Sequence, residues 1–268
     1  MKKINRRSFL AAAGLTAAAL ALTACGGSAS STASSTASSA ASSEAASTSA
    51  AAELTTVEAG KLTMATNAAF PPYEMTTDAG EFEGIDIDTA KAIAEKLGLE
   101  LQIDDMDFDA ALLSVQQGKA DIVMAGVTVT DERKAVMDFS DSYATGIQSI
   151  IVPEGSDITS PDDLAGKKIG TQRGTTGYIY CSDDFGDENV VAYDDGLTAV
   201  QALNNGQVDA VVIDNAPAQE FVAANPGLKV LDTSYAEEDY AIGMAKGSSL
   251  EAAVNAALEE LKADGTLQ

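Results

Sequence analysis

The chain has 268 residues, of which 46% are apolar, and this length allows two modest domains once a leader is subtracted. Its formal charge of −25 opposes binding to nucleic acids and to anionic membrane surfaces. It has no histidine, which excludes serine or cysteine triads that need imidazole, zinc sites ligated by histidine, and histidine acid–base chemistry, whereas carboxylate or lysine catalysis stays open.

Residues 1–24 have the parts of an export signal. Basic residues within the first seven positions precede an apolar stretch, 9–22, that is too short for an ordinary spanning helix. The segment LTAC that follows resembles a lipoprotein cleavage box, so we expect Cys25 to become the mature N-terminus and to carry lipid. A plain secretory leader with an unrelated cysteine is the alternative. The pair Arg6-Arg7 before SFL also resembles a twin-arginine signal, so both export routes stay open.

Residues 25–53 form a segment of low complexity. After Cys25 it consists almost entirely of Ser, Ala, Thr and Gly, and Glu44 is the only charge up to residue 52. Such a composition cannot bury enough apolar surface to fold. We therefore expect a disordered tether that holds an extracytoplasmic folded part at the cell membrane through the lipid on Cys25.

From residue 62 onward, apolar strands and amphipathic helices alternate. This order predicts parallel sheets covered by helices, which is the α/β class. The predicted strands are 62–66, 99–103, 122–125, 168–171, 190–193 and 209–213, and the predicted helices are 88–97, 109–117, one near 176, 198–205, 217–223 and 250–263.

Two segments of the chain share one local pattern. In each, a helix is expected to stop at a glycine, and an aspartate then precedes an apolar strand. The first is QGKAD, which ends at Asp121 before IVMA, and the second is NGQVD, which ends at Asp209 before AVVI. This repetition predicts two similar lobes.

The segment after the strand 122–125 has the groups that hold a carboxylate. Thr128 and Thr130 follow the strand at the end where ligands of parallel sheets bind. Arg133 adds a planar fork that matches a carboxylate. The alternative is that Arg133 is an ordinary solvated helix arginine.

Motifs lie along nearly the whole chain after the tether. They are LTMATNAAFPPYE at 62–74, GIDID at 84–88, GKADIVMAGVTVTDERKAVMDFSDSY at 118–143, LAGKKIG at 164–170 with GTTG at 174–177, and VDAVVID at 208–214. In this order they resemble the polar amino-acid-binding receptors of bacterial ABC transporters, solute-binding protein family 3.

This resemblance implies an α/β, two-lobed, periplasmic-binding-protein-like type II fold with a two-strand hinge. The strand-like stretches 146–152 and 239–246 stand where the family's hinge crossings lie. We expect residues 54–145 together with 241–268 to form lobe 1, and residues 146–240 to form lobe 2.

The resemblance also implies which residues contact a ligand in the cleft between the lobes. Arg133, Thr128 and Thr176 would bind the α-carboxylate of an amino acid. Asp214 and the carbonyl of Gly126 would bind its α-ammonium group. On spacing alone, a helix N-cap is an equal alternative for Asp214.

Four further positions match residues that surround the ligand side chain in this family. Phe70 and Phe108 match the flanking rings, although the bare sequence fits core aromatics as well. Asn67 and Gln172 match the positions at the tip of the side chain, and Tyr240 is an additional candidate. Asn67 stands where binders of basic amino acids tend to have Asp, so the sequence favours a polar, uncharged or weakly acidic ligand, such as glutamine or cystine.

We therefore expect an extracytoplasmic lipoprotein that captures one L-amino acid and delivers it to an ABC permease and its ATPase, which are separate proteins. No catalytic residue, cofactor, metal site or nucleic-acid partner is expected, and the chain is expected to act as a monomer. Two alternatives stay open, namely an enzyme on the same fold, similar to cyclohexadienyl dehydratase, and a ligand-sensing lipoprotein.

Overall fold

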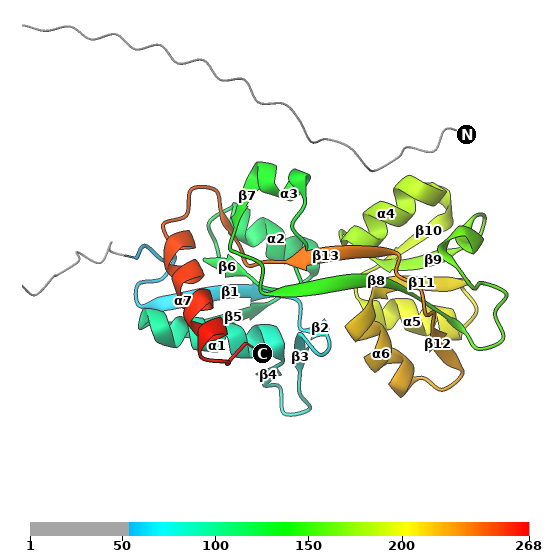
Figure 1. Cartoon of the computed structure of the whole chain (residues 1–268), viewed down its shortest axis with the longest axis horizontal. Helices are drawn as coiled ribbons and strands as arrows, with labels where there is room; N and C mark the ends of the chain where they lie inside the picture. The colour runs from blue at the N-terminus through cyan, green and yellow to red at the C-terminus, as the bar shows by residue number, and fades with distance from the viewer. Residues whose placement is uncertain (1–53, 268) are drawn as a thin grey trace, which may run out of the picture. The chain divides into compact units, whose positions relative to one another are not determined.

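The computed structural model describes residues 54–267, which form an α/β fold with two lobes, each built around its own sheet (Figure 1). The predicted fold class is therefore confirmed. The predicted signal peptide, the lipid-bearing Cys25 and the tether lie outside the described residues. None of the helices between residues 54 and 267 combines the length and the apolar character that a bilayer crossing needs.

The first lobe comprises the strands β1 (Lys61–Thr66), β2 (Ala69–Phe70), β3 (Glu74–Thr76), β4 (Phe82–Glu83), β5 (Glu100–Asp105), β6 (Ile122–Val123), β7 (Met137–Phe139) and β14 (Gly243–Ala245), with the helices α1 (Ile85–Leu97), α2 (Phe108–Gln116), α3 (Asp131–Val136) and α7 (Glu251–Ala263). Its main sheet has the order β5-β1-β6-β14-β7, and β2, β3 and β4 form a separate small sheet. β1 runs parallel to β5 and β6, whereas β14 is antiparallel to β6 and β7.

The second lobe comprises the strands β8 (Ala144–Pro153), β9 (Ile169–Gln172), β10 (Val190–Tyr193), β11 (Ala210–Asp214), β12 (Leu228–Val230) and β13 (Ala236–Tyr240), with the helices η1 (Pro161–Leu164), α4 (Thr176–Phe185), η2 (Asp187–Asn189), α5 (Gly196–Asn204) and α6 (Asn215–Ala224). Its sheet has the order β10-β9-β11-β8-β12. β9 is parallel to β10 and β11, and the long strand β8 is antiparallel to β11, β12 and β13.

Contacts between distant residues move some element boundaries away from the predicted ones. The helix predicted from residue 88 begins at Ile85, because Gly84 has a φ of 125° and turns the chain against the preceding loop. A Cβ atom on Gly84 would lie 2.3 Å from the carbonyl oxygen of Tyr73. The backbone N–H groups of Ile85 and Asp86 donate to the carbonyls of residues 72 and 73, which lengthens the helix at its start.

Two strand predictions need correction. The strand predicted over 122–125 contains only Ile122 and Val123, although Met124 and Ala125 are buried as expected. The hinge strand predicted over 239–246 is two strands, β13 and β14, which belong to different sheets. An apolar run alone cannot show that its two halves pair with different partners.

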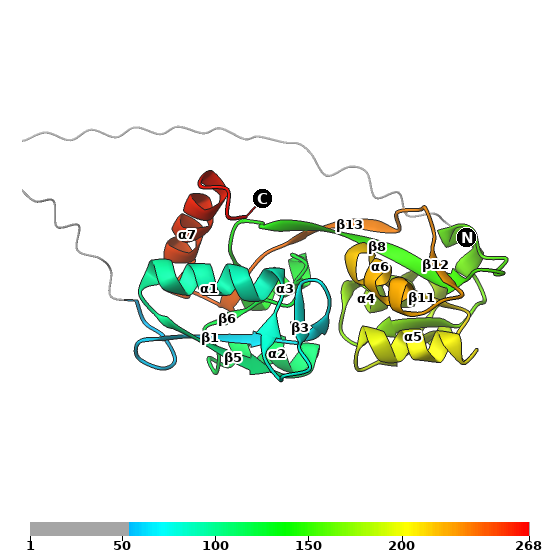
Figure 2. The ribbon, with the colours of Figure 1, turned by 90° about the horizontal axis from the view of Figure 1, so that it is seen from below.

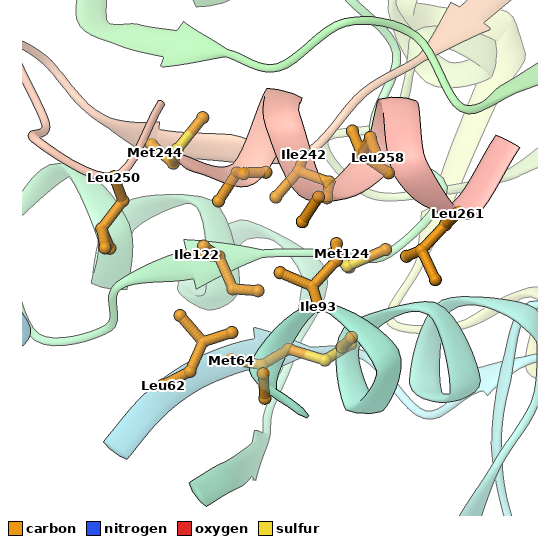
Figure 3. Close-up of a cluster of buried hydrophobic side chains, with 14 of the residues drawn as sticks. Leu62, Met64, Ile93, Ile122, Met124, Ile242, Met244, Leu250, Leu258 and Leu261 are labelled. Atoms are coloured by element: carbon orange, nitrogen blue, oxygen red, sulfur yellow. The ribbon is translucent and has the colours of Figure 1, made fainter. Parts of the chain in front are cut away.

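The core of the first lobe is built from both ends of the described chain. Figure 3 shows that side chains of β1, α1 and β6 pack against side chains of β14 and α7. The buried residues include Leu62, Met64, Ile93 and Ile122 from the N-terminal part and Met244, Val254, Leu258 and Leu261 from the C-terminal part. The C-terminal segment therefore contributes to the same core as β1.

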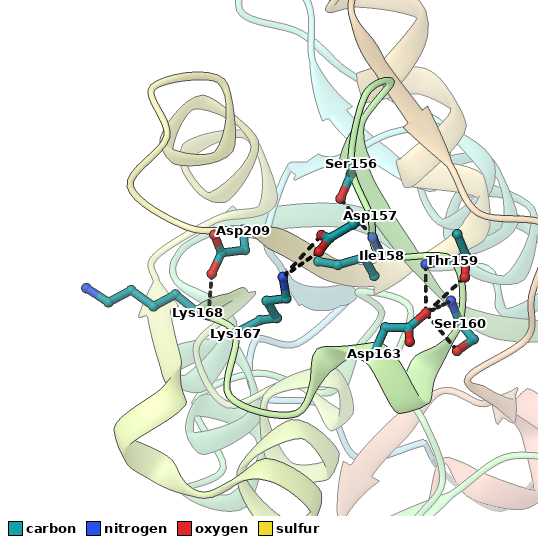
Figure 4. Close-up of polar contacts among 9 residues, drawn as sticks. All are labelled: Ser156, Asp157, Ile158, Thr159, Ser160, Asp163, Lys167, Lys168 and Asp209. Carbon is teal, nitrogen blue, oxygen red and sulfur yellow. Dashed lines mark hydrogen bonds and ion pairs between the residues drawn. The ribbon is translucent and has the colours of Figure 1, made fainter.

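The two copies of the repeated glycine–aspartate pattern make equivalent contacts. The glycine of each copy has a positive φ, 65° and 68°, as a glycine that ends a helix does. Asp121 accepts a hydrogen bond from the N–H of Thr63 in β1 (2.7 Å), and Asp209 accepts one from the N–H of Lys168 just before β9 (2.8 Å; Figure 4). Asp121, just before β6, thus binds the backbone of the neighbouring strand β1, and Asp209, just before β11, binds the backbone just before the neighbouring strand β9.

We expect Asp121→Ala to destabilise the protein more than Asp209→Ala. Asp121 is buried and also accepts from the N–H of Val57 (2.7 Å), so its loss leaves two backbone donors unpaired, whereas Asp209 is exposed. We expect the free energy of unfolding to fall by about 3 kcal/mol at position 121 and by about 1 kcal/mol at position 209. Urea unfolding at constant pH measures both, and equal losses would contradict this assignment.

The strands β8 and β13 pair side by side and connect the lobes (Figures 1 and 2). β8 begins directly after Tyr143, and the chain continues from Tyr240 at the end of β13 into β14 of the first sheet. The predicted domain boundaries at residues 146 and 240 fall on these two strands. The division of the chain at those residues stays a prediction.

Candidate ligand-binding site

One cavity brings together nine of the residues that were predicted to contact a ligand, whereas Thr130 and the additional candidate Tyr240 do not line it. Its empty space is about 320 Å³, including the part open to solvent. The predicted residues on its walls are Asn67, Phe70, Phe108, Gly126, Thr128 and Arg133 from the first lobe and Gln172, Thr176 and Asp214 from the second. Glu74, Ala125 and Thr175 also line it, and the sequence analysis assigned no ligand contact to them.

Arg133 is a buried cation with no carboxylate partner. The Thr130 hydroxyl caps α3 by accepting a hydrogen bond from the Arg133 N–H (3.1 Å), which positions this side chain. The guanidinium donates to the carbonyls of Thr128 (2.8 Å) and Gly174 (3.2 Å), one from each lobe, and lies 5.3 Å from the ring centre of Phe108. It makes no ion pair within residues 54–267. At 8% exposure, it is not the solvated arginine of the alternative interpretation, and this burial lowers its pKa.

Two of the threonines in the predicted carboxylate site face each other across the cavity. The hydroxyl oxygens of Thr128 and Thr176 are 3.4 Å apart, and both residues are buried. The Thr128 hydroxyl also lies within hydrogen-bond distance of Glu238 (3.1 Å). Thr130 does not line the cavity, because its hydroxyl is used as the cap of α3. The predicted donor set is therefore corrected to Thr128 and Thr176.

Asp214 is a buried acid at the carboxyl end of β11. It accepts hydrogen bonds from the Tyr240 hydroxyl and from the side-chain amide of Gln148 (2.8 Å). It stands at the N-cap position of α6, but its side chain makes no capping bond, so the N-cap interpretation does not explain this carboxylate. Burial raises its pKa to about 7, against the effect of the Tyr240 hydrogen bond. A cation bound beside it would favour its ionised form.

Gly126 lies on the cavity wall in a conformation that suits glycine alone. Its φ is 55°, and a Cβ atom there would lie 2.8 Å from the ring of Phe70 and 3.4 Å from that of Tyr240. Its N–H donates to the carboxylate of Asp86 (3.1 Å). Any larger residue here would therefore press on the ring of Phe70, and the role of the Gly126 carbonyl as an ammonium acceptor stays a prediction.

Phe70 and Phe108 both pack in the core and line the cavity. Phe70 stacks on Tyr73, with ring centres 5.8 Å apart, and belongs to a buried cluster. Phe108 packs in the core of the first lobe beneath Arg133. Both rings also line the cavity, so they are core residues whose outer faces form its apolar walls.

The two side-chain amides at the cavity bind each other. The Gln172 amide donates to the carbonyl oxygen of Asn67 (2.8 Å), and the Asn67 amide donates to the carbonyl of Met106 (2.9 Å). These groups therefore have partners without a ligand, and they link the two lobes. Arg173 is exposed and lies 3.5 Å from Asp194, so it behaves as a solvated arginine.

Glu74 is a functional candidate that the sequence analysis missed. It is fully buried, and neither of its carboxylate oxygens receives a hydrogen bond from an amide or hydroxyl group within residues 54–267. Burial raises its pKa well above the ordinary value, and the neighbouring Asp86 raises it further. The available signal was an acid at the end of the otherwise apolar run AAFPPYE. A buried acid without donors on the wall of a cavity indicates a place for a cation.

Glu238 and Gln148 form a second missed group, on the connecting strands. The Gln148 amide donates to Glu238 (2.9 Å) as well as to Asp214, and Glu238 faces the Thr128 hydroxyl. A chain of polar contacts thus runs from β8 and β13 to the cavity. These residues are far apart in the sequence and belong to no common motif, so the sequence could not predict that they contact one another.

Comparison with known proteins agrees with this geometry. Residues 62–268 match the family of bacterial extracellular solute-binding proteins, family 3. The chain belongs to this family. Among its relatives, a probable histidine-binding protein of Neisseria gonorrhoeae is 33% identical, with 98% of this chain and 93% of that protein covered. The L-cystine-binding protein TcyJ of Escherichia coli K12 is 33% identical, with 79% and 81% covered.

Similar proteins with solved structures are also named as amino-acid-binding proteins. An ancestral arginine-binding protein bound to glutamine is 44% identical, has a TM-score of 0.74, and covers 78% of this chain and 94% of its own. The arginine-, lysine-, histidine-binding protein ArtJ of Geobacillus stearothermophilus is 36% identical, with a TM-score of 0.74 and coverage of 77% and 91%. Similar proteins with this fold are thus known with both charged and neutral ligands.

The cavity of this family 3 protein is lined by more acidic than basic side chains. Its lining contains one basic side chain, Arg133, and two acidic ones, Glu74 and Asp214. Within the described part of the chain, no cluster of three or more His, Cys, Asp or Glu residues is arranged to hold a metal ion. The site can therefore hold one anionic group beside Arg133 and cationic groups beside the two acids.

Proposed function

We propose that this protein captures an L-amino acid between its lobes, outside the cytoplasm, and delivers it to an ABC permease. The observation that carries this proposal is the pair of buried charges on the two lobes, Arg133 and Asp214, which line one cavity without opposite charges of their own. An amino acid bears both complementary charges on one carbon, a carboxylate for the fork of Arg133 and an ammonium for Asp214. The names of the relatives, which are all amino-acid-binding proteins, support the same conclusion.

Capture follows from the position of these groups on opposite lobes. A ligand held by both Arg133 and Asp214 makes contacts with both lobes, which is possible only in the closed conformation. The ligand therefore shifts the population toward the closed conformation. The contacts of Arg133 with carbonyls of both lobes, and of Gln172 with Asn67, are compatible with such closure.

We further propose that the ligand side chain is positively charged. Once Arg133 takes the α-carboxylate and Asp214 the α-ammonium, Glu74 is still a buried acid that has no cation beside it and whose neighbour is a second acid, Asp86. A buried carboxylate without compensation costs several kcal/mol, whereas a guanidinium or ammonium group on the ligand would compensate it. This argument outweighs the sequence-based preference for a neutral ligand, because the amides of Asn67 and Gln172 are already paired with each other.

A neutral ligand such as glutamine is the second candidate. It is favoured by the two amides at the cavity and by the absence of an acid at position 67. If Glu74 stays protonated, its hydroxyl can donate to a ligand amide, and no charge is then left without a partner. Ancestral arginine-binding proteins that are 44% identical to this chain have been solved with glutamine and with arginine, so this fold accommodates both ligands.

A thermal-shift screen of the protein without its leader against the standard L-amino acids, followed by calorimetry, tests these proposals. The largest shifts are expected with L-arginine or L-lysine, and none is expected with amines that lack the α-carboxylate. A preference for L-glutamine or L-cystine would reject the positive side chain but not capture itself. Uptake of the radiolabelled ligand should fall in cells without this protein, and unchanged uptake would favour the ligand-sensing alternative.

We propose that the chain itself performs no chemistry on its ligand. The relatives are named as binding proteins, and the acids at the cavity are needed as partners for the charges of the ligand. Incubation of the protein with its ligand should leave the ligand chemically unchanged by mass spectrometry. A new product whose formation depends on Asp214 would support the enzyme alternative instead.

The anchor at Cys25 is proposed from the sequence alone. We expect wild-type cells to contain a mature N-terminus at Cys25 that carries lipid, and Cys25→Ala to leave an unlipidated precursor. The thiol is the attachment point, so its loss should release the protein from the membrane fraction. Mass spectrometry of the N-terminus measures this, and a mature wild-type form without lipid would contradict the proposal. Cys181→Ala is the matched control, since that thiol is buried in the second lobe.

A further inference from the structure

Asp86 is a fully buried acid in the first turn of α1 that does not itself line the cavity. Its two carboxylate oxygens have separate partners. One accepts a hydrogen bond from the N–H of Gly126 (3.1 Å), and the other accepts one from the hydroxyl of Tyr143 (2.8 Å). Asp86 therefore contacts the cavity wall from behind.

Gly126 is held tightly at this point. The rings of Phe70 and Tyr240 lie against it, and its positive φ is one that other residues rarely adopt. The bond to Asp86 fixes its N–H, so the orientation of this short piece of backbone depends on a side chain outside the cavity. Asp86 also neighbours Glu74, which lines the cavity. A change at Asp86 should therefore reach the α-ammonium end of the ligand through Gly126 and the side-chain end through Glu74.

The second partner of Asp86 lies at the connection between the lobes. Tyr143 directly precedes β8, and its N–H donates to the carbonyl of Tyr240 at the end of β13 (3.0 Å). Asp86 thus holds Gly126 in a fixed relation to the two connecting strands. The N–H of Asp86 is in turn bonded to the carbonyl of Tyr73 (2.9 Å), which fixes the start of α1.

We infer that Asp86 is a positioning residue for ligand binding, which holds the backbone of Gly126 so that it can accept the α-ammonium group of the ligand. This inference rests on the proposed function. Asp86 does not touch the ligand. The part of its effect that acts through Gly126 should therefore depend on whether the ligand has an α-amino group, a dependence that a general loss of structure would not produce.

The test compares two probes that differ in this group alone, L-arginine and 5-guanidinopentanoic acid. Both probes keep the guanidinium, so any effect of Asp86 through Glu74 is common to them, and Asp86→Ala is expected to weaken binding of L-arginine about tenfold more than binding of the deaminated acid. Asp86→Asn keeps one oxygen that can accept from Gly126, so it should recover most of the lost affinity. If wild type prefers glutamine, L-glutamine and 4-carbamoylbutanoic acid are the corresponding pair.

Asp88→Asn is the matched control, because Asp88 is in the same helix turn but is exposed and contacts only Lys91 among the described side chains (3.3 Å). It should leave both affinities unchanged. Equal weakening of both probes by Asp86→Ala, or no recovery in Asp86→Asn, would overturn the inference while leaving the proposed function intact. Failure of wild type to bind either L-arginine or L-glutamine would overturn both. Each ratio of affinities is measured within one variant below its melting temperature, so a loss of stability does not alter it.

Discussion

Arg133→Ala removes most of the stabilisation that a saturating amino acid gives to the wild-type protein. At a ligand concentration about 100 times the dissociation constant, this stabilisation is about 2.7 kcal/mol. The expected loss follows from the position of Arg133, which is the single basic residue on the cavity wall and the partner proposed for the α-carboxylate. Arg133→Lys should recover only part of the effect, because a lysine keeps the charge but loses the bidentate fork. Thermal shifts with and without ligand measure all three proteins.

The control for this experiment is Arg173→Ala. Arg173 is close in sequence to Gln172 at the cavity, but its own side chain is 56% exposed. We expect this variant to keep the full ligand-induced shift. An Arg133→Ala protein that binds its ligand as wild type does would show that the carboxylate is held elsewhere.

Glu74→Gln is expected to weaken the binding of L-arginine roughly 100-fold or more, because the ligand cation loses its buried partner. Binding of L-glutamine should change by less than about threefold, since no charge is involved. Calorimetry with both ligands measures the difference. Glu83→Gln is the control, because this nearby acid is in the same small sheet but is exposed. Unchanged affinity for L-arginine in the Glu74→Gln variant would reject the positively charged side chain.

The same variant separates the pH dependence of Glu74 from that of Asp214. Both carboxyl groups have raised pKa values, Asp214 to about 7. A cationic group binds the ionised form, so the affinity for arginine should rise with pH, and protons should be released on binding. Calorimetry in buffers with different ionisation enthalpies counts these protons, and Glu74→Gln should release fewer than wild type. Without ligand the sign is opposite. The folded state holds these protons above the unfolded pKa of about 4, so their contribution to stability falls as the pH rises toward 7.

Residue patterns were sufficient to predict the two lobes and the walls of the cavity. The two repeated segments that end at Asp121 and Asp209 are local signals, because the end of a helix at a glycine and the start of an apolar strand depend on neighbouring residues. The residues expected at the cavity came together because each follows the carboxyl end of a strand or begins a helix, which is where a parallel sheet binds ligands.

The parts that were missed depend on contacts between distant residues. Glu74 could not be assigned a role from the sequence, because its lack of a donor is visible only when all of its neighbours are known. The preference for a neutral ligand was drawn from Asn67 and Gln172 without knowing that these two amides bind each other. The split of the predicted strand 239–246 into β13 and β14 likewise depends on which sheet each half joins. In these cases the chemical character of the residues was clear from the sequence, but the groups that they contact in the fold were not.

The place of β14 in the first sheet has a consequence for how the chain acquires its structure. β14 lies between β6 and β7, and the helix α7 that follows packs on the core that contains β1. The ribosome delivers a chain from its N-terminus, so the sheet that contains β1 cannot be completed until residues 243–245 have been synthesised. The strands of the second sheet lie between residues 144 and 240 and can pair earlier. The lobe that begins first in the sequence is thus the last to be finished, and it stays incomplete for almost the entire synthesis of the chain.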